Sequence, residues 1–331
     1  MNEAIAVPPG WHLVAFSGDV KRGQVVPVEH FARPIVLTRL ATGEVRATAR
    51  HCPHLGADLA RATIEGDTLV CPLHAWKFDG RGSCVEAPGY EVQKRRLRVF
   101  PTLERFGAIF VSSDPAPDHE PAFQTAAADT LYFRRGGQIE VGCPWHVIAC
   151  NGYDIHHFRT IHRRGFHVPP RIDNVSPKQL RVQIHAKVLG DSARDQRLRK
   201  MTEDSVCIQI VNHGGSLLTV ETDLRVFKTY LFLSLFPIAR DRTLVRYTLG
   251  IPRTRFALLD HARHAYAYRH AERFLEDDVV SLAGARLSPK MLTKDDEHLL
   301  QFFGWLETLE SDHLDRPIQI RTRSIEPASE S

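Results

Sequence analysis

The chain has 331 residues, of which 43% are hydrophobic and 25% charged, and its formal net charge is +4. This length allows two domains with a sizeable core, and this composition is ordinary for a globular protein. No stretch resembles a nucleic-acid-binding patch, no apolar run is long enough to span a membrane, and residues 1–10 lack the features of a signal peptide. We therefore expect neither a nucleic-acid-binding, nor a membrane-spanning, nor a secreted protein.

The first third of the chain is rich in predicted strands. Two apolar runs on either side of an Ala-Thr-Gly-Glu turn predict a hairpin within residues 34–49. A nearly continuous apolar run predicts a buried strand at residues 106–111. Prolines among acidic residues follow at residues 112–121, a composition typical of linkers. We predict a β-rich domain at residues 8–113 and a linker at residues 114–121.

The remainder mixes predicted helices with a predicted antiparallel sheet. Residues 145–162 are a candidate helix, and the charged residues 191–204 are an exposed loop or mobile helix, with a lid as the weaker option. Alternating apolar runs predict the sheet within residues 206–252, and helical periodicity predicts helices at 256–283 and 295–309. We predict a second domain at residues 122–320, a flexible tail at 321–331, and an α+β fold class.

Two short, proline-containing loops each offer one thiolate and one imidazole. The chain reads Cys-Pro-His at residues 52–54 and, after sixteen further residues, Cys-Pro-Leu-His-Ala-Trp at 71–76. Such a set suits a tetrahedral zinc ion, or a [2Fe–2S] cluster in which two histidines replace two cysteines. Zinc-finger ligands come as cysteine pairs followed by histidine pairs, whereas each half-site here mixes both types. We predict a cluster held by Cys52, His54, Cys71 and His74, with zinc as the alternative.

A second group of polar residues lies on the candidate helix at residues 145–162. On a helix, Asn151, Asp154 and His157 are spaced by three and share one face. His162 lies off that face unless the helix loosens or ends near Thr160. Two neutral imidazoles with one carboxylate suit a ferrous ion that must keep open positions for oxygen. The neighbouring His156 misses this spacing, so we expect it beside the ligands or exposed.

Together these two groups resemble the large subunits of the Rieske non-heme iron oxygenases, in the branch similar to single-component monooxygenases. The motif Asp-x-x-His-x-x-x-x-His of that family matches Asp154, His157 and His162 without gaps. The family takes its third iron ligand from a downstream helix, and Phe-Leu-Glu-Asp-Asp-Val-Val at residues 274–280 resembles that context. We carry the ligand role to Asp277, with Asp278 as the alternative if the helical register differs by one residue.

The resemblance implies an N-terminal Rieske domain, a helix-grip catalytic domain, and two cofactors, a [2Fe–2S] cluster and a mononuclear ferrous iron. It implies that O2 is used to hydroxylate or oxidatively demethylate a bulky hydrophobic substrate, sterol-like or polycyclic. It also implies a homotrimer in which Asp154 links His74 of one chain to His157 of the next, and we predict Asp154 and Asn151 as the catalytic residues. The sequence departs from the family at Ala75, where glycine is usual, and at Cys150, where glutamate is usual.

The electrons must come from another protein. The chain has no second cysteine cluster and no Gly-x-Gly-x-x-Gly motif between a strand and a helix. We therefore expect a separate NAD(P)H-dependent reductase, alone or with a ferredoxin. The basic run at residues 94–98 would suit an acidic donor, although an exposed, solvated strand is the explanation that we favour. The four cysteines outside the two loops show no disulfide spacing, which favours a cytoplasmic location.

Two other functions remain open from the sequence. The chain could be a non-catalytic Rieske electron-transfer or lipid-binding protein with a helix-grip cavity, or a zinc-stabilised interaction protein. No pair of arginines stands out in the sequence as a clamp for a carboxylate substrate.

Overall fold

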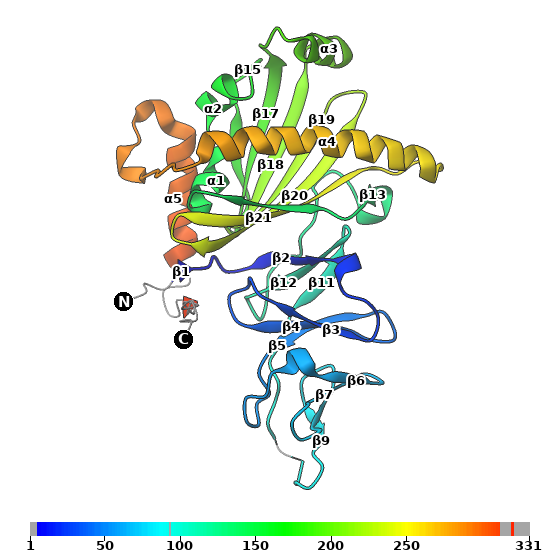
Figure 1. The fold of residues 1–331 in the computed structure, drawn as a ribbon. Coiled ribbons are helices and arrows are strands. Elements are labelled where there is room, and N and C mark those ends of the chain that lie inside the picture. Colours follow the sequence, from blue (N-terminus) through cyan, green and yellow to red (C-terminus); the bar gives the residue numbers. More distant parts are fainter. Residues whose placement is uncertain (1–4, 93, 312–318, 321–331) are drawn as a thin grey trace, which may run out of the picture.

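The computed structural model describes residues 5–92, 94–311 and 319–320. The tail predicted at residues 321–331 lies outside these residues. Figure 1 shows a small β-rich part at one end of the molecule and a large sheet crossed by a long helix at the other. The α+β fold class is thereby confirmed. Within the described residues, no helix is both long enough and apolar enough to cross a membrane.

The β-rich part contains three small antiparallel sheets among the described residues. Their strands are β2 (Trp11–Phe16), β3 (Gln24–Val28), β4 (Ile35–Arg39), β5 (Val45–Ala49), β6 (Thr63–Glu65), β7 (Thr68–Val70), β8 (Lys77–Phe78), β9 (Cys84–Glu86), β10 (Val99–Phe100), β11 (Thr102–Arg105) and β12 (Ala108–Ser112). The strand orders are β10-β5-β4-β3, β11-β12-β2 and β6-β7-β8-β9. The predicted hairpin at residues 34–49 is formed by β4 and β5.

The second part is built on a nine-stranded antiparallel sheet, as counted over the described ranges. Its order is β13-β21-β20-β19-β18-β17-β15, with β14 also pairing with β21 and β16 with β17. A further short pair, β1 (Ile5–Ala6) with β22 (Gln319–Ile320), joins the two ends of the described chain. The bounds in the large sheet are β13 (Leu131–Phe133), β14 (Gly137–Val141), β15 (Arg164–Phe166), β16 (Arg171–Ser176), β17 (Gln179–Val188), β18 (Val206–His213), β19 (Leu217–Asp223), β20 (Lys228–Ala239) and β21 (Arg242–Pro252).

The helices lie on one face and at the ends of this sheet (Figure 1). The predicted helices at 256–283 and 295–309 are confirmed as α4 and α5, and the charged segment 191–204 contains α3. Five short 3-10 turns accompany them in the described chain, at Ser17–Asp19, Leu59–Arg61, Ala128–Thr130, Pro289–Met291 and Lys294–Asp296. The α-helices are α1 (Trp145–Asn151), α2 (Ile155–Thr160), α3 (Ala193–Thr202), α4 (Ala257–Leu282) and α5 (Glu297–Ser311).

The prediction of a single helix at residues 145–162 is wrong, because the helix is interrupted between α1 and α2. Asp154 has an extended backbone, with φ −85° and ψ 100°, and its side chain accepts a hydrogen bond from the N–H of His157. Asp154 is thus the N-cap of a second helix, a position that aspartate strongly prefers. This interruption changes the direction of the chain that follows it. It therefore determines where the side chains of His157 and His162 point.

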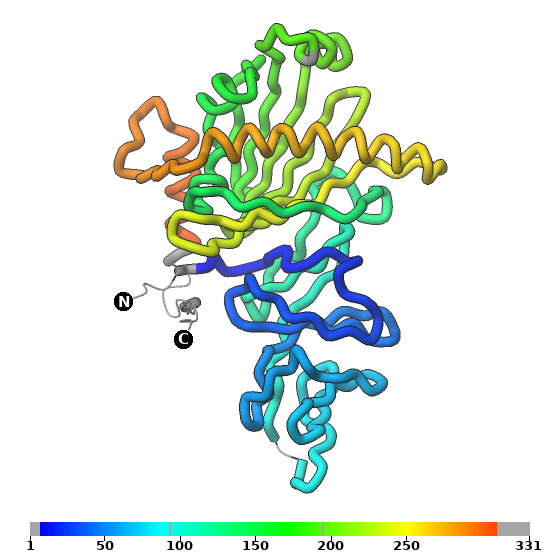
Figure 2. Tube along the Cα trace, viewed as in Figure 1, coloured from blue at the N-terminus to red at the C-terminus, as the bar shows by residue number. Residues whose placement is uncertain are grey.

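The alternation of side chains along β20 separates two environments. Tyr230 and Phe232 pack with Trp11 and Phe110 of the β-rich part in one hydrophobic cluster. Leu231 and the other odd-numbered residues face the opposite side, toward α4, because successive side chains of a strand point to opposite faces. The tube in Figure 2 shows the blue strand β2 running beside the hairpin β20–β21, with which it is in contact. The two parts therefore share a core, and the boundary at 114–121 stays a prediction.

Candidate metal centres and cavity

Two loops with the same backbone hydrogen bonds carry the first group of cysteines and histidines, at the far end of the β-rich part. The N–H of Cys52 donates to the carbonyl of Ala57 at 2.9 Å, and the N–H of Cys71 donates to the carbonyl of Trp76 at 2.8 Å. In each loop the backbone N–H of the residue four positions after the cysteine, Gly56 or Ala75, donates a hydrogen bond to the carbonyl of that cysteine. Both cysteines are buried. The two half-sites are therefore two copies of one backbone turn.

Aromatic side chains hold the two imidazoles of these loops. The rings of His54 and His74 lie 4.9 Å apart between centroids. The buried indole of Trp76 stacks on His54, with centroids 4.1 Å apart and planes 6° from parallel. Tyr90 meets His54 edge-on at 5.3 Å. Such contacts fix the ring orientations before any cofactor binds.

The residues of these loops fit a cluster better than a single zinc ion. Four ligands around one tetrahedral zinc would bring their donor atoms within about 4 Å of one another. Among the described residues, the loops contain no set of three donor atoms within 4.8 Å of one another. Burial, reinforced by the neighbouring Cys71, raises the pKa of the Cys52 thiol to about 11. The buried Nδ1 atom of His74 has no hydrogen-bond partner. A ligand that displaces the thiol proton and bonds to Nδ1 would satisfy both groups.

A cation from the basic run lies beside the first loop. The Nη1 atom of Arg95 donates to the carbonyls of Pro53 and His54, at 2.9 and 3.0 Å. The run at residues 94–98 is exposed apart from Leu97, and Arg96 forms a single β-bridge with Ser83. Part of this run therefore ties down the loop that presents His54.

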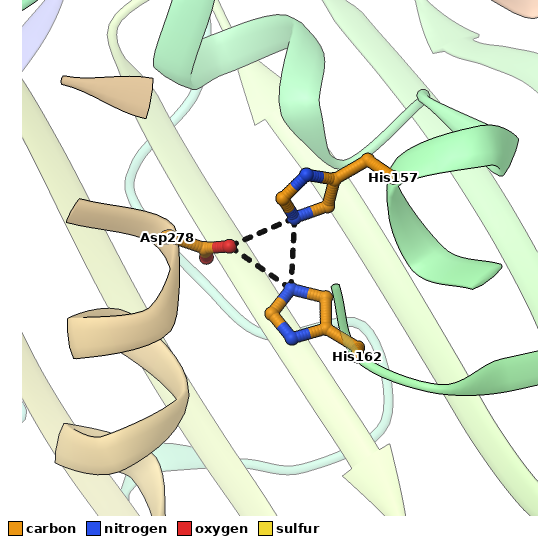
Figure 3. A group of neighbouring side chains, drawn as sticks. All are labelled: His157, His162 and Asp278. Atoms are coloured by element: carbon orange, nitrogen blue, oxygen red, sulfur yellow. Dashed lines mark hydrogen bonds and ion pairs between the residues drawn. The ribbon is translucent and has the colours of Figure 1, made fainter. Parts of the chain in front are cut away.

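The second group converges on one point beneath α4, as Figure 3 shows. The Nε2 atom of His157 lies 2.9 Å from the Nε2 atom of His162 and 2.9 Å from Oδ1 of Asp278. The Nε2 atom of His162 lies 2.9 Å from the same oxygen. Both imidazoles are buried. Three donor atoms from three segments thus form a nearly equilateral triangle.

The size of this triangle fits a metal ion with two imidazoles and one carboxylate on one face. Bonds of about 2.1 Å at right angles separate two donor atoms by about 3.0 Å, whereas tetrahedral angles separate them by about 3.4 Å. The observed 2.9 Å agrees with right angles, which leave the opposite face open. Burial alone would raise the pKa of the Asp278 carboxyl, but its bonds with His157 and His162 outweigh burial and hold that pKa below its usual value. Asp278 is therefore available as a carboxylate.

The end of α2 turns His162 toward this point. The helix ends at Thr160, as the sequence analysis required, and Arg163 follows in the left-handed region at φ 53°. The ring of Phe274 stacks on His162, with centroids 3.6 Å apart and planes 9° from parallel. His156 is exposed on the other side of α2, as expected.

The remaining predicted residues of this site lie around His157. The Nδ2 atom of Asn151 lies 3.2 Å from the Nε2 atom of His157. The Oδ1 atom of Asp154 accepts from the backbone N–H of His157 at 2.9 Å, on the helix side of that residue. Cys150 is buried and its thiol donates to the carbonyl of Val147 at 3.3 Å, so it packs inside α1. Asn151 thus reaches the converging atoms, whereas Asp154 shapes the helix that carries one of them.

Of the two aspartates considered as the third ligand, the structure brings Asp278, the alternative, to the imidazoles, and it does not bring Asp277 there. Asp277 is exposed, whereas the Asp278 side chain is 19% exposed and meets both imidazoles. One residue corresponds to about 100° of rotation on an α-helix, so only one of two adjacent aspartates can face the sheet. The register follows from the packing of α4, in which Ala267 and the later cavity-facing residues occupy the inner face.

A large apolar cavity runs from this site between α4 and the sheet. Its volume is about 900 Å³, and Asn151, His162 and Asp278 are part of its wall. Two alanines one turn apart on α4, Ala267 and Ala271, face it and leave room beneath the helix. Among the large apolar residues of this part of the chain, Leu218 and Phe227 lie in the wall. Others pack elsewhere in the core, namely Leu217, Tyr230, Phe232 and Phe236. The strand residues of the wall include Leu218, Val220, Leu231, Leu233, Val245 and Leu249.

Several residues at these sites carried no recognisable signal in the sequence. Tyr90 and Arg95 follow the second loop by fourteen residues or more, and no motif links them to it. Arg197 and Arg273 line the cavity from α3 and α4, although no arginine pair stood out in the sequence. Their roles depend on tertiary packing, which brings together segments that are far apart in the chain.

Comparison with known proteins agrees with the first group of ligands. Residues 10–101 match the family model of the Rieske [2Fe-2S] domain. The cholesterol 7-desaturase nvd of Bombyx mori is 31% identical over 161 residues, which cover 47% of this chain and 35% of that protein. The oxygenase component of a 3-ketosteroid-9-alpha-monooxygenase of Rhodococcus rhodochrous is 32% identical over 162 residues, 46% of this chain and 42% of that protein. The chain therefore spans less than half the length of these curated relatives.

The solved structures extend the likeness to nearly the whole chain. The crystal structure of dicamba monooxygenase bound to dicamba matches with a TM-score of 0.68 and 18% identity, over 92% of this chain and 98% of that one. At this identity the match establishes a shared fold. The fold includes both the β-rich part and the large sheet with its long helix.

Proposed function

We propose that this chain is a Rieske oxygenase, and that it uses O2 to hydroxylate or oxidatively demethylate a bulky hydrophobic substrate. The observation that carries the proposal is the triangle of His157, His162 and Asp278, with 2.9 Å sides, in the wall of an apolar cavity of about 900 Å³. Ligand sites of this kind are concave, mostly apolar and equipped with a few convergent polar groups.

The residues of the chain have separate tasks in this proposal. His157, His162 and Asp278 would hold a ferrous ion, and Cys52, His54, Cys71 and His74 would hold the [2Fe–2S] cluster. When bound, the iron supplies a site for O2 reduction and the cluster supplies single electrons. The apolar wall binds the body of the substrate and excludes water from the reacting carbon. The Asn151 amide, beside His157, can donate a hydrogen bond to a polar atom brought against this end of the cavity.

The substrate that we favour is sterol-like or polycyclic. Two relatives are named for action on cholesterol and on a 3-ketosteroid. The cavity runs beside α4 from Tyr266 to Asp278, a stretch of about 18 Å at 1.5 Å per residue. A fused-ring skeleton fits such a length, and burial of its apolar surface would contribute about 25 cal/mol per Å².

Electron supply would involve other chains. We propose a homotrimer in which Asp154 links His157 to His74 of the partner subunit, so that each cluster serves a neighbouring iron. We also propose that a separate NAD(P)H-dependent reductase, alone or with a ferredoxin, delivers the electrons. One of the relatives is named as the oxygenase component of its system, which supports a division of labour of this kind. The six cysteines form no disulfide among the described residues, which suits a reducing compartment, and we propose the cytoplasm.

The test combines metal analysis with two adjacent variants. Protein purified without oxygen should contain about three irons and two acid-labile sulfides per chain, with a Rieske-type visible spectrum. Asp278→Ala should lose about one iron per chain and keep the cluster spectrum. Asp277→Ala, which changes an exposed neighbour, is the matched control and should keep all three.

Other results would point to the other functions. About two irons per chain, unchanged after reconstitution with ferrous iron, would support a non-catalytic electron-transfer or lipid-binding protein. A colourless protein with stoichiometric zinc would support an interaction protein. Equal iron loss in both aspartate variants would contradict the ligand role of Asp278.

A further inference from the structure

The cavity opens to solvent through a ring of exposed residues on three segments, which we call the mouth. Two of these segments are the helices α3 and α4, which flank the opening, and the third is the turn between β19 and β20. These residues line the cavity and are also exposed, so they must lie where it meets solvent. They are Ala193, Arg197, Met201, Val226, Tyr266 and Arg273.

The charge in the cavity wall is unbalanced. Within the part of the chain that the structure describes, Asp278 is the one acidic side chain of the wall, whereas Arg164, Arg197 and Arg273 are all part of it. Arg164 has an acidic partner, because its Nη1 atom lies 3.4 Å from Oδ1 of Asp195. No ion pair joins Arg197 or Arg273 to a carboxylate among the described residues.

An anion at the mouth would find these two cations beside apolar walls. A guanidinium binds a carboxylate through two parallel N–H···O bonds, and this interaction is stronger beside apolar surface than in bulk water. The net positive charge of the wall rests on the proposed function. If Asp278 binds iron, its charge is compensated there, and the wall as a whole is positive.

The positions along α4 set the shape of the ligand. Arg273 precedes Asp278 by five residues, about 7.5 Å along the helix axis, and Tyr266 lies about 10 Å further from the metal-binding end. A molecule whose acidic group stays at Arg273 must therefore extend its apolar body across the cavity toward Asp278, because Ala271 and Ala267 lie further from the metal-binding end than Arg273 does. A neutral sterol would fill the same cavity and leave both arginines facing water.

We propose that the substrate of this cavity is an amphipathic carboxylate, whose charged group is bound at the mouth by Arg197 and Arg273 while its fused-ring body occupies the apolar interior. Arg197 and Arg273 are specificity-determining residues in this assignment. They recognise the end of the substrate that does not react. The carboxylate thereby also selects which end of the molecule enters first.

The test compares acids with their neutral esters in the intact chain. Calorimetric titration at low salt uses two pairs of probes, cholan-24-oic acid with its methyl ester and 2-naphthoic acid with its methyl ester. In at least one pair the acid should bind about tenfold more tightly than the ester. Arg197→Gln and Arg273→Gln should each remove most of this preference and leave ester binding unchanged. Added salt should weaken binding of the acid alone.

Two controls on the same helices isolate the effect of position. Arg269→Gln on α4 and Lys200→Gln on α3 remove an exposed positive charge that does not line the cavity, and they should retain the preference. Absence of an acid preference in both pairs, or its persistence in both arginine variants, would overturn the proposal. Binding is measured without turnover, so loss of the iron site would refute the proposed oxygenase activity and leave this result readable.

Discussion

Phe274 and Asp278 lie one turn apart on α4 and act on the same imidazole. The ring of Phe274 stacks on His162 at 3.6 Å, and the Oδ1 atom of Asp278 lies 2.9 Å from its Nε2 atom. One face of α4 therefore fixes the plane of the His162 ring and also supplies the Asp278 oxygen that lies beside this ring in the triangle. This pairing fixes the orientation of His162 at the end of the cavity where we propose that iron binds.

Removal of the stacked ring should weaken iron binding. Phe274→Leu keeps an apolar side chain but loses the flat contact, and aromatic pairs of this kind contribute about 0.5–1.5 kcal/mol. We expect a two- to tenfold loss of iron affinity, about the equivalent of that energy. Competition with a ferrous chelator without oxygen would measure it. Phe256→Leu, at the exposed start of the same helix, is the control, and equal affinities in the two variants would refute the role of the stack.

Two substitutions at Asp154 separate its role as a helix cap from its proposed role as a link between centres. Asparagine caps helices as well as aspartate does, so Asp154→Asn should preserve α2 and both metals. Its neutral amide accepts hydrogen bonds from imidazole more weakly than a carboxylate does, and turnover should be lost. Asp154→Ala should lose turnover as well and about 1 kcal/mol of stability. Iron analysis, denaturant unfolding and coupled O2 consumption would give the three readouts.

The result for Asp154→Asn decides whether Asp154 acts as a link between the centres or only as a helix cap. Normal coupled turnover in that variant would show that a carboxylate is not required there. Loss of iron in that variant would instead mean that the cap was not preserved, and Asp154 would then be a residue that positions His157.

The two cluster loops allow a matched test of backbone strain. Ala75 lies in the left-handed region at φ 55°, and Gly56, at the corresponding position of the first loop, at φ 75°. A side chain in this region costs about 1 kcal/mol. Ala75→Gly should therefore raise the denaturant midpoint of the cluster-bearing part slightly, the gain being reduced by the entropy of glycine in the unfolded chain. Gly56→Ala should lower it, since no atom lies within 4 Å of a Cβ built there and strain is the main cost.

Unfolding followed by the visible absorption of the bound cluster would measure both variants. Changes of the same sign in the two variants would mean that contacts, rather than backbone strain, control this position. Neither variant changes a cluster ligand, so the iron and sulfide content serves as the internal control.

The features that sequence patterns predicted well are those whose partners lie close together in the chain. The half-sites at Cys52 and Cys71 are each a single turn, and the ligand types within them already distinguish the cluster from a zinc finger. The need for α2 to end near Thr160 followed from the position of His162 alone. The long periodic segment that became α4 was predicted to within about a residue at each end, because its pattern is continuous.

The features that were missed depend on segments distant in the chain. Which of Asp277 and Asp278 faces the sheet is decided by how α4 rotates against strands that precede it, and a one-residue error cannot be detected in the helix itself. The helix break at Asp154 was hidden because capping and interior positions share the same three-residue spacing. Arg197 and Arg273 lie on separate helices, and only the folded chain brings both to one opening.

The two alanines of α4 determine how far the cavity extends. Ala267 and Ala271 lie about three and two turns from Asp278, so they bound the region of the chamber that is remote from the metal-binding end. A valine or leucine at either position would shorten the chamber by the volume of a few carbon atoms and leave the donor atoms in place. The size of the molecule admitted and the arrangement of the donor atoms are therefore separable traits in this protein. Substitutions at Ala267 and Ala271 are enough to alter the size of the molecule admitted while the donor atoms stay in place.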